Sequence, residues 1–169
     1  MISEKLLTAL NDQFNFELES AYAYMAMAAY CSDEEFDGFS HFFIMQAQEE
    51  YQHAMKFYDF IYDMDGSVKM EAIPKPEGNY DSILAVFKDA LGHEEMVTGK
   101  ISKIMDLAIE ENNHFTKNFL QWFIEEQLEE ETTMKKIIST LEKIDNNFQG
   151  MYMLDKELGQ RVLEPIAEN

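Results

Sequence analysis

Glutamates placed among apolar residues are the first feature of this sequence that suggests chemistry. Each of four long helical patterns carries one glutamate near its midpoint, on the apolar stripe: Glu17, Glu50, Glu94 and Glu130. Glutamate is almost never buried without a partner. Carboxylates that share an apolar layer raise one another's pKa, and burial adds to this effect, unless positive charge lies among them. The spacing therefore predicts metal ions bound between the helices.

A histidine one helical turn after the second of these glutamates adds a nitrogen ligand. His53 follows Glu50 by three residues, so both side chains can reach one ion from the same helix face. This Glu-x-x-His spacing is typical of helix bundles that bind pairs of iron or manganese ions. Oxygen donors with one imidazole favour these metals over zinc, which prefers tetrahedral, thiolate-rich sites. Glu50 could bridge two ions, and Tyr24 and Gln127 fall at a level where they can hydrogen-bond to ligands.

A purely structural interpretation of these residues is that the buried carboxylates pair with basic side chains and that His53 is a hydrogen-bonded core histidine. The chain has 13 Lys and Arg residues, and none lies nearby on the four stripes. Metal ligation is therefore the interpretation that the sequence favours.

Long stretches of helical periodicity must position this layer. Apolar residues recur at steps of three and four, which predicts helices over residues 3–31, 36–64, 81–111, 115–145 and 151–162, with Ser3 and Asp81 as caps. Residues 65–80 hold two of the three prolines and form a connector that can reach roughly 50 Å, whereas a helix such as the second is about 43 Å long. The sequence therefore predicts an all-α fold in one domain over residues 1–169. It is a four-helix bundle with one long crossover and a short fifth helix.

The composition limits the partners of the chain. Its 169 residues carry 13 basic and 33 acidic side chains, a formal net charge of −20. Such a charge repels phosphate backbones and anionic membranes and attracts cations, so neither nucleic acid nor a membrane is an expected partner. The single cysteine, Cys31, cannot form an intramolecular disulfide, and the N-terminal residues contain no apolar stretch typical of a signal peptide. We expect a cytoplasmic protein.

Several motifs beyond the glutamate layer resemble those of bacterial non-haem ferritins. The similarity extends from Leu6 to about Val162 and includes the crossover. It is carried by residues 15–19 (NFELE), 47–53 (AQEEYQH), 118–123 (NFLQWF), 125–131 (EEQLEEE) and 151–158 (MYMLDKEL). The resemblance implies iron storage by a ferroxidase. A homo-oligomeric shell of 24 subunits would take up Fe(II), oxidise it with O₂ or peroxide, and deposit ferric mineral inside.

By position in these motifs, the resemblance implies an intrasubunit di-iron centre that would carry out the oxidation. The first iron would be held by Glu17, Glu50 and His53. The second would be held by Glu50, Glu94 and Glu130, with Gln127 nearby. Tyr24 matches a tyrosine beside the centre that can donate an electron, although a purely structural aromatic residue is equally consistent with its position.

Part of the acidic run on the fourth segment matches a third iron site of bacterial ferritins. The members of this site would be Glu49, Glu126, Glu129 and Glu130. Without the resemblance, the glutamates of residues 125–131 are typical of a solvated helix face, on which like charges one turn apart repel weakly.

Differences between this sequence and two related families favour a non-haem ferritin over a bacterioferritin or a miniature ferritin. Bacterioferritins carry a Glu-x-x-His pair on the fourth helix as well and a methionine that ligates haem. This chain instead has Gln127-x-x-Glu130 and Gln52, so no haem is expected. Miniature ferritins lack a fifth helix and bind iron between subunits. Two alternatives stay open: a small-oligomer di-iron oxidase or peroxidase similar to rubrerythrin, although the chain has no Cys-x-x-Cys module, and a helical scaffold whose glutamates bind structural metal.

Overall fold

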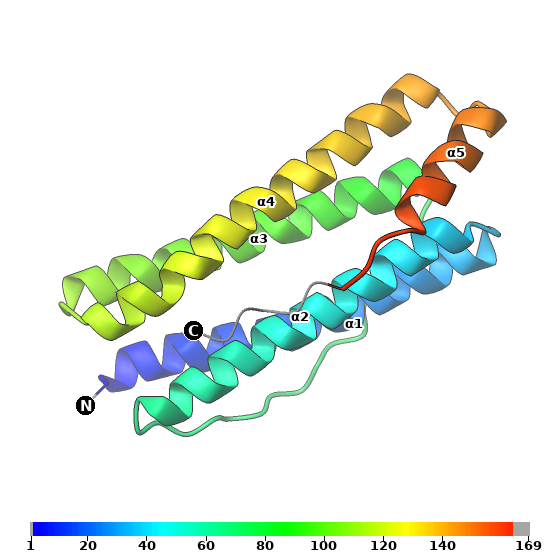
Figure 1. Cartoon of the computed structure of the whole chain (residues 1–169). Coiled ribbons are helices and arrows are strands. Elements are labelled where there is room, and N and C mark those ends of the chain that lie inside the picture. The colour runs from blue at the N-terminus through cyan, green and yellow to red at the C-terminus, as the bar shows by residue number, and fades with distance from the viewer. Residues whose placement is uncertain (1, 164–169) are drawn as a thin grey trace.

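The computed structural model describes residues 2–163 and contains five α-helices and no β-strand in that range. They are α1 (Glu4–Asp33), α2 (Asp37–Asp63), α3 (Ile83–Glu110), α4 (His114–Ile144) and α5 (Phe148–Leu158). The first four form an elongated bundle, and α5 lies at one end of it (Figure 1). This confirms the all-α class with its long crossover and short fifth helix. Residue 1 and residues 164–169 of the expected single domain lie outside the described part.

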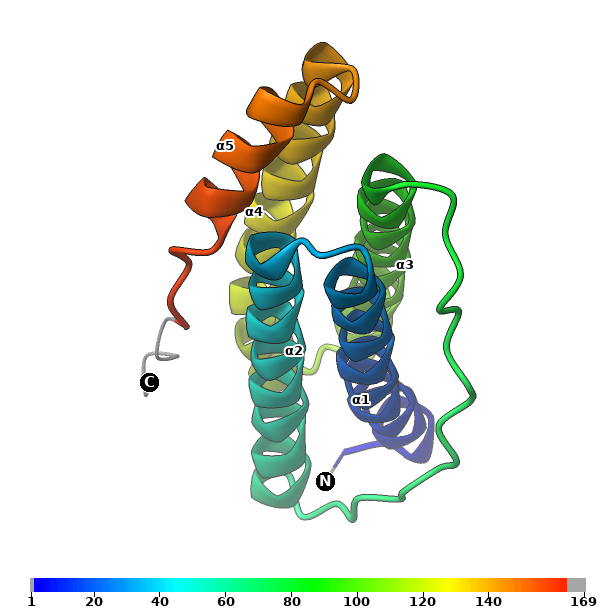
Figure 2. The same cartoon turned by 90° about the vertical axis from the view of Figure 1, so that its right-hand side faces the viewer.

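The connections between helices set their directions. Short turns make α1 antiparallel to α2 and α3 antiparallel to α4, as the sequence predicts. Glu35 and Asn112 in these turns have positive φ values of 63° and 54°, which end the preceding helices abruptly. Residues 64–82 instead run along the outside of the bundle beside α1, so α2 and α3 point the same way (Figures 1 and 2).

Two asparagines of α1 hold this crossover against the bundle. Asn11 donates from Nδ2 to the Ser67 carbonyl oxygen at 3.1 Å and accepts from the Lys69 N–H at 2.6 Å. One turn further, Asn15 donates to the Lys69 carbonyl oxygen at 2.7 Å and accepts from the Glu71 N–H at 2.9 Å. Because these side-chain amides satisfy backbone groups that have no helical partner, the crossover follows a fixed path.

Side-chain caps begin four of the helices. The capping residues accept a hydrogen bond from a backbone N–H in the first turn that follows, and they are Ser3, Ser82, Asn113 and Asn147. The expected cap at Ser3 is confirmed, whereas the cap of α3 is Ser82 and not Asp81. The Asn147 cap makes α5 start at Phe148, and the helix ends at Leu158, so both ends come earlier than the expected 151–162.

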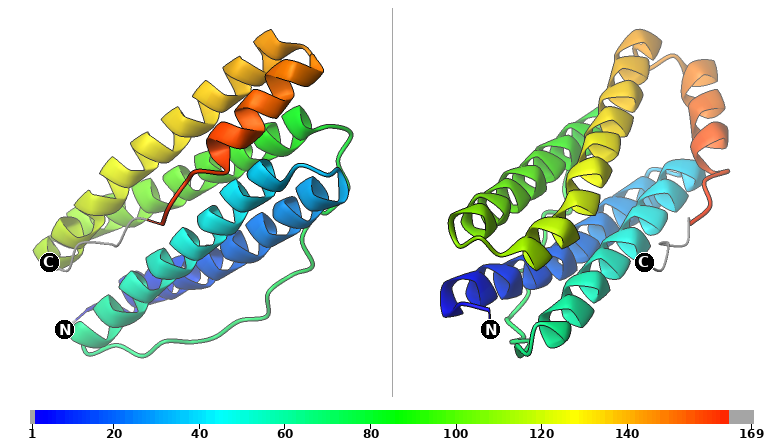
Figure 3. Two further views of the ribbon diagram at one scale, coloured as in Figure 1. Left: turned by 45° about the vertical axis from the view of Figure 1, so that its right-hand side comes forward. Right: turned by 60° about the vertical axis from the view of Figure 1, so that its left-hand side comes forward.

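The fifth helix packs against the start of α2 (Figure 3). Asp155 Oδ1 accepts a hydrogen bond from the Phe39 N–H at 2.9 Å, although the α2 N-cap residue, Phe36, offers no side-chain cap of its own. The two backbones are so close that a Cβ on Gly38 would lie 1.7 Å from the Asp155 carbonyl oxygen. Asp155 therefore caps α2 from a distant part of the chain, and glycine at position 38 permits the contact.

The bundle interior consists of two apolar clusters with a polar layer between them. The cluster at the α5 end includes Tyr24, Phe39, Phe43 and Phe87. The cluster at the other end includes Leu10, Phe57, Ile101 and Phe123. The polar residues that separate them on the four long helices are Glu17, Ser20, Glu50, His53, Glu94, Gln127 and Glu130, all buried. No helix in the described range is both long and apolar enough to cross a bilayer.

Candidate metal centre

The polar layer brings together one compact set of candidate ligands from α1 and α2. Ligand atoms of Glu17, Glu50 and His53 all lie within 4.8 Å of one another, and these residues are 0, 1 and 2% exposed. No other group of three or more His, Cys, Asp or Glu side chains within residues 2–163 is arranged in this way. The His53 ring is wedged by edge-on contacts with Trp122 and Phe123, at centroid separations of 5.4 and 5.8 Å. The three side chains are therefore buried, and the ring contacts fix the orientation of His53.

Three carboxylate oxygens of this set have no hydrogen-bond partner. They are Glu17 Oε2 and both side-chain oxygens of Glu50. Glu17 Oε1 accepts from Gln13 Nε2 at 2.8 Å, and His53 Nδ1 lies 3.5 Å from Glu50 Oε2. Buried polar atoms without partners are strongly unfavourable. A metal ion bound by these oxygens and the imidazole would remove that penalty, so the donor set fits such an ion.

Glu94 and Glu130, on α3 and α4, face the same layer with their oxygens held by protein donors. The Tyr24 hydroxyl donates to Glu94 Oε1, and Gln127 Nε2 donates to Glu94 Oε2 at 3.0 Å. Gln46 Nε2 donates to Glu130 Oε2 at 3.0 Å. Tyr24 and Gln127 are thus both hydrogen-bonded to Glu94. Gln46 is a further hydrogen-bond donor to the layer, and it was not predicted from the sequence.

Burial raises the pKa of all four glutamates of the layer above the ordinary value. The charge of Glu50 adds to this effect at Glu17, and the charge of Glu94 adds to it at Glu50. Burial raises the pKa of Glu94 too, opposed by the hydrogen bond from Tyr24, and it raises the pKa of Glu130 to about 8. The raised pKa values favour the protonated form of these carboxyls, and a bound cation would favour the ionised form instead.

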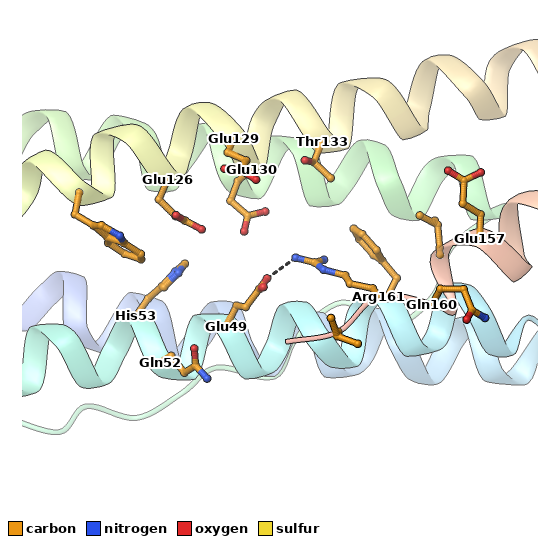
Figure 4. A pocket seen from close by; sticks show the side chains of 14 residues that line it. Glu49, Gln52, His53, Glu126, Glu129, Glu130, Thr133, Glu157, Gln160 and Arg161 are labelled. Atoms are coloured by element: carbon orange, nitrogen blue, oxygen red, sulfur yellow. Dashed lines mark hydrogen bonds and ion pairs between the residues drawn. The ribbon is translucent and has the colours of Figure 1, made fainter. Parts of the chain in front are cut away.

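A cavity of about 610 Å³ opens beside this layer, toward α5 and residues 159–163 (Figure 4). Its acidic lining residues are Glu49, Glu126, Glu129, Glu130 and Glu157, and His53 also reaches it. The structure therefore gathers the residues expected at a third iron site around one space that adjoins the first ligand set. Burial raises the pKa of Glu49, and the charge of Arg161 acts in the opposite direction.

Arg161 is a residue of this cavity that the sequence reasoning missed. Its side chain extends from the segment after α5 toward Glu49 (Figure 4), and its guanidinium donates to Glu49 Oε2 and Gln46 Oε1. It is the only arginine in the chain, which is the signal that could have drawn attention to it. The apolar pattern placed Arg161 within the expected helix over 151–162, whereas α5 ends at Leu158 and residues 159–163 lack helical structure, so the pattern did not place it in the site.

Comparison with known proteins agrees with this geometry. Residues 7–144 match the model of the ferritin-like domain. The chain belongs to the ferritin family. The bacterial non-heme ferritin of Staphylococcus aureus (strain USA300) is 42% identical to it over 164 residues, which cover 97% of this chain and 99% of that relative. The one from Staphylococcus haemolyticus (strain JCSC1435) is 43% identical over 161 residues, covering 95% and 97%.

Solved structures of ferritins have the same fold as this chain. An open-pore ferritin from the archaeon Archaeoglobus fulgidus is 41% identical and superposes with a TM-score of 0.95, covering 96% of this chain and 99% of that one. A humanized archaeal ferritin is 40% identical with a TM-score of 0.96, covering 98% and 100%. The resemblance inferred from the sequence motifs is therefore confirmed over nearly the whole chain.

Proposed function

We propose that this protein stores iron, oxidising Fe(II) with O₂ or peroxide at a di-iron ferroxidase centre within each subunit and keeping ferric mineral inside a 24-subunit shell. The observation that carries the proposal is the buried set of Glu17, Glu50 and His53, in which three carboxylate oxygens have no partner. Membership of the ferritin family supports iron as the metal. Iron is here the substrate and the cargo.

The proposed centre has two metal positions that share Glu50. Glu17, Glu50 and His53 would bind the first Fe(II), and Glu50, Glu94 and Glu130 the second. Glu50 suits a bridging role because neither of its side-chain oxygens has a hydrogen-bond partner. The Glu94 oxygens accept hydrogen bonds from Tyr24 and Gln127, but each carboxylate oxygen has a second lone pair that can still bind a metal.

The carboxylate layer also suits the oxidation chemistry. A pair of Fe(II) ions supplies a pair of electrons, which together with a pair of protons reduce dioxygen to hydrogen peroxide or hydrogen peroxide to water. Carboxylates are hard donors that prefer the more highly charged Fe(III), so they favour the oxidised product. Tyr24, whose hydroxyl donates to Glu94, lies beside the centre as a candidate electron donor.

The cavity beside the centre supports a third iron position. Glu49, Glu126 and Glu129 line it together with Glu130, which would also bind the second iron. An ion there would be bound next to the proposed second iron position, because Glu130 belongs to both sets.

Assembly into a shell is supported by the surface of the isolated chain. Phe115, Leu128 and Phe148 are 74, 72 and 81% exposed, and large apolar side chains at such positions suit burial between copies. Native mass, measured before and after aerobic Fe(II) loading, separates storage from the rubrerythrin-like alternative. A small oligomer that stops at about two irons per chain would rule out storage.

Substitutions at the centre test the ferroxidase activity. Glu50→Ala and His53→Ala should each slow Fe(II) oxidation by roughly tenfold or more, because even groups that only orient metal ligands are worth that much. The matched control is Glu110→Ala, which removes an exposed carboxylate paired with Lys5 on the surface. Stopped-flow absorbance after mixing with Fe(II) in air measures the rate. Wild-type rates in either centre variant would refute the proposal, and so would equal slowing in Glu110→Ala.

A further inference from the structure

The cavity that adjoins the centre contains one fixed positive charge. Among its lining residues, five are glutamates and one, Arg161, is a permanently charged base. Arg161 lies in residues 159–163, just after α5, and its side chain is 21% exposed. A cation supplied by the chain therefore lies in a cavity whose acidic lining would otherwise attract only external cations.

Contacts along one side of α2 hold this arginine. The guanidinium donates to Glu49 Oε2 and to Gln46 Oε1, and it lies over the Phe42 ring at 4.5 Å from the centroid. The backbone is held too, since the Arg161 carbonyl oxygen lies 2.7 Å from His41 Nε2. Arg161 is therefore fixed by two side-chain hydrogen bonds, one cation–π contact and one backbone contact, and it does not extend freely into solvent.

Gln46 connects Arg161 to the metal layer. Its side-chain oxygen accepts from Arg161, and its Nε2 donates to Glu130 at 3.0 Å. A guanidinium has only hydrogen-bond donors, so the side-chain oxygen of Gln46 must face Arg161. The side-chain nitrogen of Gln46 then faces Glu130. The charge of Arg161 also favours the ionised forms of both Glu49 and Glu130.

The segment that carries Arg161 is anchored by the docking of α5. Asp155 accepts the Phe39 N–H at the start of α2, and a Cβ on Gly159 would lie only 3.2 Å from the Gly38 Cα. The backbone therefore leaves α5 at a fixed point next to α2, two residues before Arg161. The side chain of Arg161 therefore reaches Glu49 from a backbone that is fixed only two residues earlier, at Gly159.

We propose that Arg161 determines how many metal ions the site accepts, acting as a tethered cation that holds Glu49 and must be displaced before a third ion binds. The inference rests on the proposed iron-binding function and refines it. The Arg161 guanidinium held at Glu49 Oε2 repels a metal cation that approaches the same carboxylate, so the two cations compete for Glu49. Within residues 2–163, Arg161 has no hydrogen bond or ion pair with Glu17, Glu50 or His53, so this first ligand set fills independently.

Anaerobic Fe(II) titration of the assembled, metal-free protein measures this competition. Calorimetry of the wild type and of Arg161→Gln gives the number of ions bound per subunit and the affinity of each class. We expect the variant to bind a third ion roughly tenfold more tightly or better, about 1.4 kcal/mol, with the affinity of the first ion unchanged within about threefold. Anomalous diffraction from anaerobically soaked crystals should then show iron between Glu49, Glu126 and Glu129.

Two further variants make the test specific. Lys156→Gln removes one positive charge from α5 at a residue whose ammonium lies over Tyr152, outside the cavity, and should leave the third ion unchanged. Arg161→Lys keeps a charge at the same position and should restore most of the wild-type behaviour. Equal third-ion affinity in wild type and Arg161→Gln, or an equal gain in Lys156→Gln, overturns the role of Arg161 and leaves the proposed function standing. Failure of Fe(II) to bind at Glu50 in every variant overturns both.

Discussion

Replacing Glu130 with glutamine tests how the acidic layer is stabilised without metal. Burial, and then the charge of Glu94, raises the pKa of Glu130 from 4.5 to about 8. A carboxyl whose pKa is higher in the folded than in the unfolded chain stabilises the fold fully below the unfolded pKa, and this contribution is lost as pH rises through the folded pKa. The metal-free wild type should therefore become less stable between about pH 4.5 and about pH 8.

The size of this effect follows from the number of protons involved. Between the two pKa values the folded chain keeps a proton that the unfolded chain has released, so each pH unit lowers the free energy of unfolding by about 1.4 kcal/mol. From pH 5.5 to 7.5 the loss is about 2–3 kcal/mol. Glu130→Gln keeps an oxygen that can accept from Gln46 but cannot titrate. Relative to wild type its melting temperature should rise by about 5–10 °C over that interval.

Calorimetric melting of both proteins in the presence of a chelator, at several pH values, measures the difference. An exposed control, Glu110→Gln, should show no such pH dependence relative to wild type because water screens its charge. Adding Fe(II) without oxygen should remove the slope from the wild type, since the ion replaces the proton. If the difference in melting temperature between wild type and Glu130→Gln stays constant from pH 5.5 to 7.5, Glu130 does not keep a proton in the folded, metal-free protein. That result would refute the prediction.

Three further predictions concern the supports of the fold. Gly38→Ala would place a Cβ 1.7 Å from the Asp155 carbonyl oxygen, so α5 should shift, with a loss of about 1–3 kcal/mol and faster hydrogen exchange over residues 148–158; unchanged exchange would contradict this. Asn15→Ala should speed exchange of the Glu71 N–H and lower stability by about 1 kcal/mol, as nuclear magnetic resonance and melting can measure. Burial raises the pKa of Cys31 to about 12, so mass spectrometry should find it unmodified by iodoacetamide at pH 8 unless the fold is first denatured.

The glutamate layer was predictable because a helix converts residue number into position. With 3.6 residues per turn and 1.5 Å per residue, the spacing along each segment fixes both the face and the height of a side chain. The four glutamates and His53 accordingly lie together in the structure between two apolar clusters. Gln46 could have been found in the same way, because it lies one turn before Glu50 on the same helix.

Contacts made by irregular segments were not predictable from periodicity. Arg161 reaches Glu49 across 112 residues of sequence, from a segment without regular structure. Asp155 caps α2 from 116 residues away in the sequence, so the residues near Phe39 give no indication of this cap. Such pairings depend on how α5 docks, and α5 itself begins where Asn147 caps it and not where its apolar pattern suggests.

The division of the core by a polar layer has a consequence for folding. Leucine and phenylalanine clusters tolerate several alignments of neighbouring helices, since one large apolar side chain can replace another at modest cost. A slip of α2 by one turn would move Glu50 out of the polar layer toward an apolar cluster and bring Ala47 or Ala54 to its place among the carboxyls. Single buried polar residues fix the register of coiled coils in this way. The residues proposed to bind iron during its oxidation therefore also fix the axial alignment of the helices, before any metal has bound.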